Sequence, residues 1–192
     1  MLALQGAFAL HLKMLRDLGA RAVEVRTPPD LDAADALVIP GGESSTMSMQ
    51  LQRAGLREPL EDRLAGGMPA FGTCAGAILL GREILDGRPD QQPFGAIDLV
   101  VRRNGYGRQV DSFEAEILLA GDPVPMEATF IRAPLIEAVG DGVEVLASIG
   151  GHPVVCAGST ILASTFHPEL GTDTRLHERF LALVGSVDQQ QR

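Results

Sequence analysis

Apolar residues in the first part of the chain recur at two different spacings. Phe8, Leu12, Leu15 and Leu18 follow a helical period, and the Gly19 after them is typical of a helix end. Short apolar runs bounded by Gly or Pro instead predict buried strands. On these signals we predict strands at 2–4, 22–25, 36–39 and 69–71, a helix capped by Ser44 or Ser45, and further helices at 59–65 and 75–84.

Short strand-like runs dominate the second half of the chain. Their close spacing favours antiparallel hairpins, with Gly150-Gly151 as one turn. An amphipathic helix is predicted after them, at 175–184. The predicted strands lie at 97–101, 114–119, 128–131, 143–147, 154–156 and 161–166.

The alternation of strands and helices in the first half predicts a parallel sheet with helices on both faces. We expect the later strands to extend this sheet as an antiparallel portion. The predicted fold is therefore α/β, with three layers and a mixed, mostly parallel sheet flanked by helices. Because no linker or repeat is visible, we predict a single domain over residues 1–185, followed by a flexible tail at 186–192. In such a fold, functional groups gather at the carboxyl ends of the strands.

Composition limits the classes of partner. The chain has 192 residues and a net charge of −9, from 16 basic and 25 acidic side chains. Nucleic-acid-binding proteins normally carry a basic face, so we expect no nucleic acid partner. No Lys or Arg precedes the apolar start, which Gln5 and Gly6 interrupt, so a targeting segment is not predicted. The apolar run at 68–81 is too short to cross a bilayer, so no membrane association is expected.

The two cysteines, Cys74 and Cys156, lie far apart and have no CxxC spacing. This pattern favours neither a disulfide framework nor a zinc site, and a zinc set completed by His152 and His167 fails on spacing too. We expect no metal, no cofactor and a reducing cytoplasmic location. Cys156 stands in an apolar strand and is predicted to be part of the core.

Residues 72–76 read Gly-Thr-Cys-Ala-Gly, follow a predicted strand and open a predicted helix. This is the form of a nucleophile elbow, in which a sharp strand-to-helix turn presents a strained nucleophile and the flanking glycines let the chain pass closely. The helix N-terminus favours a thiolate. We therefore predict that Cys74 is a catalytic nucleophile, whereas without the glycines it would be interpreted as a small core residue.

A thiolate nucleophile needs a proton shuttle, which is usually a histidine. His167 ends a predicted strand, and Pro168 biases it towards an extended backbone. Since alternate side chains of an extended chain point the same way, Glu169 can reach one ring nitrogen of His167 and leave the other for Cys74. The remaining histidines are expected to be surface or structural residues: His11, His152 and His177.

The attacked carbonyl oxygen becomes negatively charged and needs two backbone N–H donors. The elbow offers one, from Ala75. The second is expected from the Pro-Gly-Gly-Glu-Ser loop at 40–44, which follows the predicted strand at 36–39. The same loop also fits an ordinary strand-to-helix turn with a serine cap.

Together these segments resemble the class I (triad-type) glutamine amidotransferases, and in particular the glutaminase subunits of pyridoxal phosphate synthase. The elbow and the His-Pro-Glu pair mark the wider class, and the segments at 103–113 and 130–134 mark the vitamin B6 branch. The resembling segments are Leu-Gln-Gly-Ala at 4–7, Pro-Gly-Gly-Glu-Ser at 40–44, Phe-Gly-Thr-Cys-Ala-Gly at 71–76, Arg-Asn-Gly-Tyr-Gly-Arg-Gln-Val-Asp-Ser-Phe at 103–113, Phe-Ile-Arg-Ala-Pro at 130–134 and Phe-His-Pro-Glu-Leu at 166–170.

The resemblance implies a triad of Cys74, His167 and Glu169, with backbone oxyanion donors at Gly42 and Ala75. It also implies that L-glutamine is hydrolysed and that ammonia passes through a synthase subunit, on which the glutaminase docks as part of a hetero-oligomer. Where family members tend to carry Arg-Glu before the first-helix histidine, this chain has Ala9 and Leu10, near the expected docking face. The implied glutamine-binding residues are Gly42, Glu43, Ser44, Arg103, Ile131 and Arg132.

Two alternatives remain open at the level of sequence. An amidotransferase subunit of another pathway, such as histidine biosynthesis, would share the triad but use a different synthase. A cysteine hydrolase or peptidase with the same elbow would turn over esters or peptides without glutamine.

Overall fold

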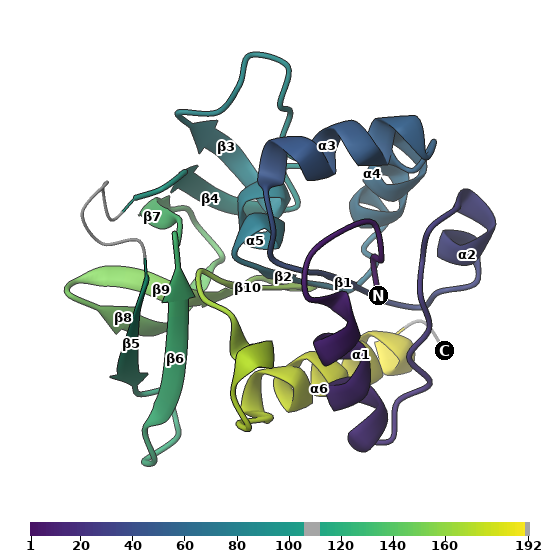
Figure 1. The fold of residues 1–192 in the computed structure, drawn as a ribbon. Coiled ribbons are helices and arrows are strands. Elements are labelled where there is room, and N and C mark those ends of the chain that lie inside the picture. Colours follow the sequence, from purple (N-terminus) through teal and green to yellow (C-terminus); the bar gives the residue numbers. More distant parts are fainter. Residues whose placement is uncertain (106–111, 191–192) are drawn as a thin grey trace.

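The computed structural model describes residues 1–105 and 112–190 of the chain (Figure 1). The segment predicted to be functional at 103–113 therefore lies in part, at 106–111, outside the described residues. The helices are α1 (Phe8–Asp17), α2 (Pro28–Asp32), α3 (Ser44–Arg53), α4 (Arg57–Ala65), α5 (Ala75–Leu80), the 3-10 helix η1 (Pro168–Leu170) and α6 (Arg175–Gln190). The strands are β1 (Leu37–Ile39), β2 (Ala70–Thr73), β3 (Gly81–Leu85), β4 (Ile97–Arg102), β5 (Ser112–Ile117), β6 (Met126–Ile131), β7 (Leu135–Val139), β8 (Glu144–Ile149), β9 (His152–Ala157) and β10 (Ile161–Ser164).

A five-stranded sheet with the order β1-β2-β10-β9-β8 forms the centre of the fold. Its strands β1, β2 and β10 are parallel, and β9 and β8 add antiparallel pairs at one side. The hairpin between β8 and β9 turns at Gly150 and Gly151, whose φ angles of 57° and 82° favour glycine. The predicted parallel core with an antiparallel extension is therefore confirmed for this sheet.

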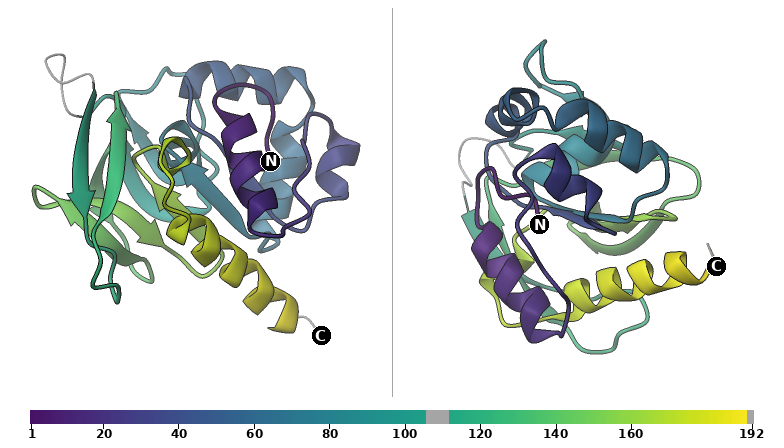
Figure 2. Two further views of the ribbon diagram at one scale, coloured as in Figure 1. Left: turned by 60° about the horizontal axis from the view of Figure 1, so that its bottom comes forward. Right: turned by 90° about the vertical axis from the view of Figure 1, so that its right-hand side faces the viewer.

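Helices cover both faces of the central sheet (Figures 1 and 2). Along β1, Leu37 and Ile39 pack into one buried apolar cluster with α3, α4 and α5. Val38, which points to the other face, packs into a second cluster with α1 and α6. This alternation accounts for the three layers, and it confirms the predicted α/β class with a mixed sheet between helices.

Two smaller sheets lie beside the central one. Strands β3, β4 and β7 form one of them, and β5 and β6 form a separate hairpin. The prediction that the later strands extend a single sheet is therefore wrong for the predicted strands at 97–101, 114–119 and 128–131, which form β4, β5 and β6. The physical reason is that β3 pairs with β4 directly after α5, which starts a new sheet away from the central one.

The predicted helix at 75–84 is wrong in its second half. Helix α5 ends at Leu80, because Gly81 adopts an extended conformation with φ −58° and ψ 165°. From Gly81 the chain continues as β3 in parallel pairing with β4. An apolar run of this length fits either a buried helix or a strand, and the glycine marked the change.

Three further features differ from the prediction. The runs at 2–4 and 22–25 form a single parallel bridge, between Leu2 and Val25, instead of full strands. Strand β7 and helix α2 were not predicted. Helix α2 begins with Pro28 at its first turn, where proline is favoured, so this proline starts a helix in addition to ending an extended run.

The cap of α3 is Glu43 and neither Ser44 nor Ser45 as predicted. A carboxylate at this position accepts from two backbone N–H groups at once, and it also suits the positive end of the helix dipole.

At the other end of the chain, α6 continues to Gln190, past the predicted start of the tail at residue 186. The division into a domain and a flexible tail stays a prediction. No helix among the described residues is long and apolar enough to cross a membrane.

Candidate functional site

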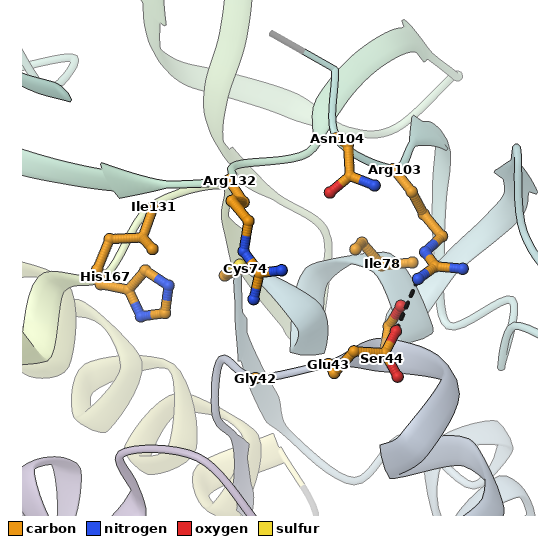
Figure 3. A pocket seen from close by; sticks show the side chains of 10 residues that line it. All are labelled: Gly42, Glu43, Ser44, Cys74, Ile78, Arg103, Asn104, Ile131, Arg132 and His167. Carbon is orange, nitrogen blue, oxygen red and sulfur yellow. Dashed lines mark hydrogen bonds and ion pairs between the residues drawn. The ribbon is translucent and has the colours of Figure 1, made fainter. Parts of the chain in front are cut away.

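Three of the predicted site residues follow the carboxyl ends of three adjacent parallel strands. Gly42 follows β1, Cys74 follows β2, and His167 follows β10. Because these strands are neighbours in the sheet, residues far apart in the sequence meet at one edge (Figure 3). The requirement that the whole site lie at strand ends is therefore met.

Cys74 has the strained backbone that an elbow requires. Its φ is 49° and its ψ is −103°, and it stands directly before α5. A positive φ is uncommon for a residue with a side chain, and it persists only where surrounding contacts fix it. One such contact is the hydrogen bond of 2.8 Å that the Cys74 N–H donates to the Ser164 carbonyl of β10.

The two flanking glycines are needed for close packing. A Cβ atom at Gly72 would lie 2.6 Å from the carbonyl carbon of Gly76, and a Cβ atom at Gly76 would overlap the carbonyl oxygen of Ile39 in β1. Both neighbours are backbone atoms and cannot move aside without disturbing the sheet. The two glycines thus allow α5 to pack directly against the ends of the strands, which places Cys74 at the wall of a cavity.

His167 and Glu169 are paired as predicted. His167 Nδ1 lies 2.8 Å from Glu169 Oε1, and the Glu169 side chain is fully buried. The His167 N–H donates to the Thr129 carbonyl of β6 at 2.9 Å, which fixes the backbone of the histidine. With Nδ1 donating to the carboxylate, Nε2 remains for the thiol of Cys74.

The electrostatics favour the charged forms of both groups. Burial disfavours the His167 imidazolium, but the hydrogen bonds with Cys74 and Glu169 outweigh it and raise the pKa of His167 to about 10. Burial likewise disfavours the Glu169 carboxylate, but the imidazoles of His11 and His167 lower the pKa of Glu169 to about 2. The arrangement therefore holds an imidazolium between a sulfur and a carboxylate, as an activated cysteine requires.

A cavity of about 200 Å³ opens over Cys74 and His167 (Figure 3). This is room for a small molecule, and the lining mixes charged, polar and apolar groups. All six residues predicted to bind glutamine lie on it. The lining residues are Gly42, Glu43, Ser44, Cys74, Ile78, Arg103, Asn104, Ile131, Arg132 and His167.

Glu43 and Arg103 form an ion pair at the wall of the cavity. Arg103 Nη2 lies 2.6 Å from Glu43 Oε1, and the dashed line in Figure 3 marks this contact. Glu43 also accepts from the backbone and hydroxyl groups of Ser45 and Thr46. Burial opposes the Glu43 charge, but these bonds lower its pKa to about 2. Glu43 is thus a fixed anion that orients the guanidinium of Arg103. Arg103 Nη1 also donates to Gln91 Oε1 at 3.3 Å, and the other N–H groups can bind a ligand.

Ser44 and Arg132 offer further polar groups. Ser44 is buried, and its hydroxyl has no hydrogen-bond partner among the described residues. A buried hydroxyl beside a cavity that lacks a partner is suited to bind a ligand. Arg132 has a φ of 43°, a conformation that most side chains avoid, so the turn after β6 is strained where it borders the cavity.

The loop at 40–44 packs tightly against the base. A Cβ atom at Gly41 would lie 2.8 Å from His167 Nδ1, so only glycine allows the imidazole to approach. Gln5 Nε2 donates to the Glu43 carbonyl at 2.6 Å and lies beside Gly42. These contacts place the loop next to the elbow, where a second oxyanion donor is expected. The donor roles of Gly42 and Ala75 remain predictions.

The sequence did not single out several residues of the site. Ile78 lies four residues after Cys74, and this helical spacing could have placed it on the cavity side of α5. Asn104 stands beside Arg103 in a left-handed conformation with φ 49°. His11 and His177 are fully buried behind Glu169. His11 shares the helical apolar spacing of Phe8, Leu12 and Leu15, which was the signal available.

The two remaining candidates lie outside the site. Cys156 is buried within β9, and burial raises its pKa to about 12, so it is a core residue as predicted. His152 is exposed at the start of β9.

The whole chain resembles known glutamine amidotransferases. The model of the SNO glutamine amidotransferase family matches residues 1–186. A curated relative, the pyridoxal 5'-phosphate synthase subunit PdxT of Mycobacteroides abscessus, is 54% identical over 183 residues, covering 95% of each chain. The protein of the same name from Mycobacterium avium is 53% identical over 189 residues, covering 97% of this chain and 96% of its own.

Solved structures agree with this assignment. A crystal structure described as a glutamine amidotransferase superposes with a TM-score of 0.89 at 45% identity, covering 96% of this chain and 97% of its own. The structure of PurLQS from Thermotoga maritima superposes with a TM-score of 0.68 at 11% identity over 97% of this chain and 95% of its own, which is a likeness of fold alone.

Proposed function

This chain belongs to the SNO glutamine amidotransferase family, and we propose that it is the glutaminase subunit of a pyridoxal phosphate synthase. It hydrolyses L-glutamine to glutamate and ammonia, and the ammonia passes to a synthase subunit in a hetero-oligomer. The observation that carries the proposal is the position of His167 between the Cys74 sulfur and the Glu169 carboxylate at the base of a cavity of about 200 Å³.

The first half of the reaction forms a thioester. The Cys74 thiolate attacks the side-chain amide carbon of glutamine, and the carbonyl oxygen becomes an oxyanion between the N–H groups of Ala75 and the loop at Gly42. The His167 imidazolium then gives its proton to the amide nitrogen, the carbon–nitrogen bond breaks, and ammonia leaves. Glu169 keeps the imidazole in the required orientation.

The second half of the reaction restores the enzyme. His167, now neutral, takes a proton from a water molecule while the water oxygen attacks the thioester carbon. The carbon–sulfur bond breaks, glutamate leaves, and the thiolate–imidazolium pair forms again. No cofactor takes part in either half, because each step moves only protons and acyl groups.

Binding of glutamine rests on the charged pair at the cavity wall. The α-carboxylate of glutamine is an anion, and the guanidinium of Arg103, oriented by Glu43, can bind it through charge-assisted hydrogen bonds. The Ser44 hydroxyl and the backbone around Ile131 and Arg132 are the other proposed contacts.

The synthase partner is inferred from the names of the relatives, and the compartment is inferred from the two cysteines. The relatives are named as subunits of pyridoxal 5'-phosphate synthase. The alignments with the two relatives described above include 95% and 97% of this chain. Both cysteines are free thiols, which is consistent with a reducing cytoplasm. A synthase of another pathway is the alternative partner, and it would share every feature of the triad.

The deciding experiment measures ammonia release from glutamine with and without a pyridoxal phosphate synthase subunit. We expect activity in the mixture, retention of the two chains in one complex, and loss of ammonia release in Cys74→Ala. Full activity of Cys74→Ala in the complex would refute the assignment of the nucleophile. Activation by a different synthase alone would refute the pathway but leave the glutaminase assignment intact.

A further inference from the structure

A second imidazole lies behind the triad, on the far side of Glu169. His11 Nε2 on α1 lies 3.2 Å from Glu169 Oε2, and the side chains of both residues are fully buried. No other described residue places a hydrogen-bond donor at Oε2. The contact with His11 is an electrostatic approach of its ring nitrogen to the carboxylate oxygen, without the alignment of a hydrogen bond. Each oxygen of the carboxylate therefore faces its own imidazole, His167 at Oε1 and His11 at Oε2.

A third imidazole fixes the second. His11 Nδ1 lies 2.8 Å from His177 Nε2 on α6. The two rings pack with their centroids 5.1 Å apart, and both meet the edge or face of Phe71 in β2 at nearly right angles. The His11 ring is thus held between α6, β2 and its own helix.

The positions of the protons follow from the partners. Glu169 is an acceptor only, so the favourable arrangement has a proton on His11 Nε2, which also faces the Thr73 hydroxyl oxygen at 3.3 Å. His11 Nδ1 then accepts a proton from His177 Nε2, and His177 Nδ1 carries none. His177 Nδ1 is buried and has no hydrogen-bond partner among the described residues. A bare ring nitrogen without a partner costs less than an N–H group without one.

The opposite arrangement is disfavoured on the same ground. If His11 donated through both nitrogens, His177 would have to accept at Nε2 and carry its proton on Nδ1, where nothing receives it. Burial, and then the neighbouring His11, lowers the pKa of His177 to about 4, so a doubly protonated His177 is disfavoured as well. Only one order of ring N–H groups, from His177 through His11 towards Glu169, leaves each of these buried N–H groups facing an acceptor.

We propose that His11 is a positioning residue of the glutaminase, which holds the Glu169 carboxylate for His167, and that His177 sets the tautomer in which His11 does so. This inference rests on the proposed function, because Glu169 matters only if His167 is the catalytic base. The helices α1 and α6 lie on the same face of the sheet (Figures 1 and 2), and neither contributes a residue to the lining of the cavity. In this proposal the two histidines connect these helices to the catalytic residues. Without His11 the carboxylate keeps one donor and can rotate away from His167.

The test compares two substitutions of one residue. His11→Gln keeps an N–H donor at the position of Nε2, and His11→Met fills the space without a donor. Leu15→Ala is the matched control, because Leu15 is buried on the same helix and packs into the apolar cluster away from Glu169. All three are assayed in the complex with the synthase, and the unfolding midpoint of each free chain is measured alongside.

We expect His11→Met to lower kcat by about tenfold or more at an unchanged KM for glutamine, and His11→Gln to recover most of the loss. Leu15→Ala should lower the unfolding midpoint while kcat stays near that of the original chain. Unchanged kcat in His11→Met would overturn the proposal. The proposal would also be overturned if kcat fell equally in His11→Met and His11→Gln, in proportion to the fall in their unfolding midpoints. That result would mean that His11 has only a packing role.

A second readout separates this inference from the proposed function. The rate at which iodoacetamide alkylates Cys74 depends on the imidazolium beside it, and no glutamine is needed. We expect the rate at neutral pH to fall severalfold in His11→Met and to be restored in His11→Gln. If the original chain released no ammonia with any synthase, the proposed function would fail, yet the alkylation series would still decide whether His11 positions the Glu169–His167 pair. An alkylation rate that is equal in the original chain, His11→Met and His11→Gln would contradict the inference.

Discussion

His167 Nδ1 and Glu169 Oε1 lie 2.8 Å apart with a single proline between the two residues in the chain. Pro168 begins the 3-10 helix η1, so the turn itself brings the carboxylate back onto the ring. The pair is therefore built from three consecutive residues. The rest of the fold adds the burial of the carboxylate, the contact of His11 with its second oxygen, and the position of the sulfur.

The first prediction concerns the tautomer that this pair fixes. In Glu169→Gln the amide can turn its NH₂ group towards Nδ1. The His167 proton would then lie on Nε2, the nitrogen that faces Cys74, and His167 could no longer take a proton from the thiol. By analogy with the loss seen when the acid of a triad becomes an amide, kcat should fall by about 10²–10⁴. Ammonia release in the complex measures it, with circular dichroism as the control for folding. Activity within twofold of the original chain would contradict the assigned role.

The second prediction is a loss of stability in acid. The pKa of Glu169 is about 2 in the folded chain, below its ordinary value of 4.5, so the carboxylate stabilises the fold fully above pH 4.5. This stabilisation, on the order of 3 kcal/mol at most, is lost as the pH falls from 4.5 towards 2. Urea unfolding at a series of pH values should show a decline in this window that is smaller in Glu169→Gln. An equal decline in both chains would contradict it.

The third prediction tests the close packing at the elbow. A methyl group at Gly76 would overlap the Ile39 carbonyl of β1, so Gly76→Ala should separate α5 from the sheet and lower both stability and activity. Gly185→Ala is the matched control, because it lies in α6 with nothing within 4 Å of the added Cβ. In a helix this second change should be neutral or stabilising, by about 0.5–1 kcal/mol. Thermal unfolding measures both, and equal midpoints would contradict the packing argument.

The fourth prediction concerns the grip on glutamine. Arg103→Met removes the guanidinium that Glu43 orients, so KM for glutamine should rise by about tenfold or more while kcat changes less. Arg82→Met is the control, since Arg82 is exposed, is paired with Asp98 and does not line the cavity. Steady-state kinetics in the complex separate the two parameters. A fall in kcat at constant KM would instead place Arg103 in the chemistry.

Much of the site could be predicted because its signals are local. The elbow at 72–76 and the pair of His167 and Glu169 each lie within five residues, and each needs a particular backbone that Gly or Pro announces. The sheet rule then brings the two segments together, since both follow parallel strands. The fold class followed from the same alternation of strands and helices.

The parts that could not be predicted depend on distant contacts. The apolar run after Cys74 changes from helix to strand at Gly81 because β4 offers a pairing edge, and nothing within the run shows that edge. His11 was expected to be a surface or structural residue on a polar stretch of its helix, whereas it is fully buried. Its partner His177 lies 166 residues away, so only the tertiary structure joins them.

The measurement that tests the central claim most directly is covalent labelling by an electrophilic glutamine analogue, followed by mass spectrometry of the peptides. The account predicts one adduct on Cys74, none on the buried Cys156, protection by glutamine, and slower labelling in His167→Ala. Labelling of Cys156 instead, or labelling of Cys74 that neither glutamine nor the loss of His167 affects, would contradict it.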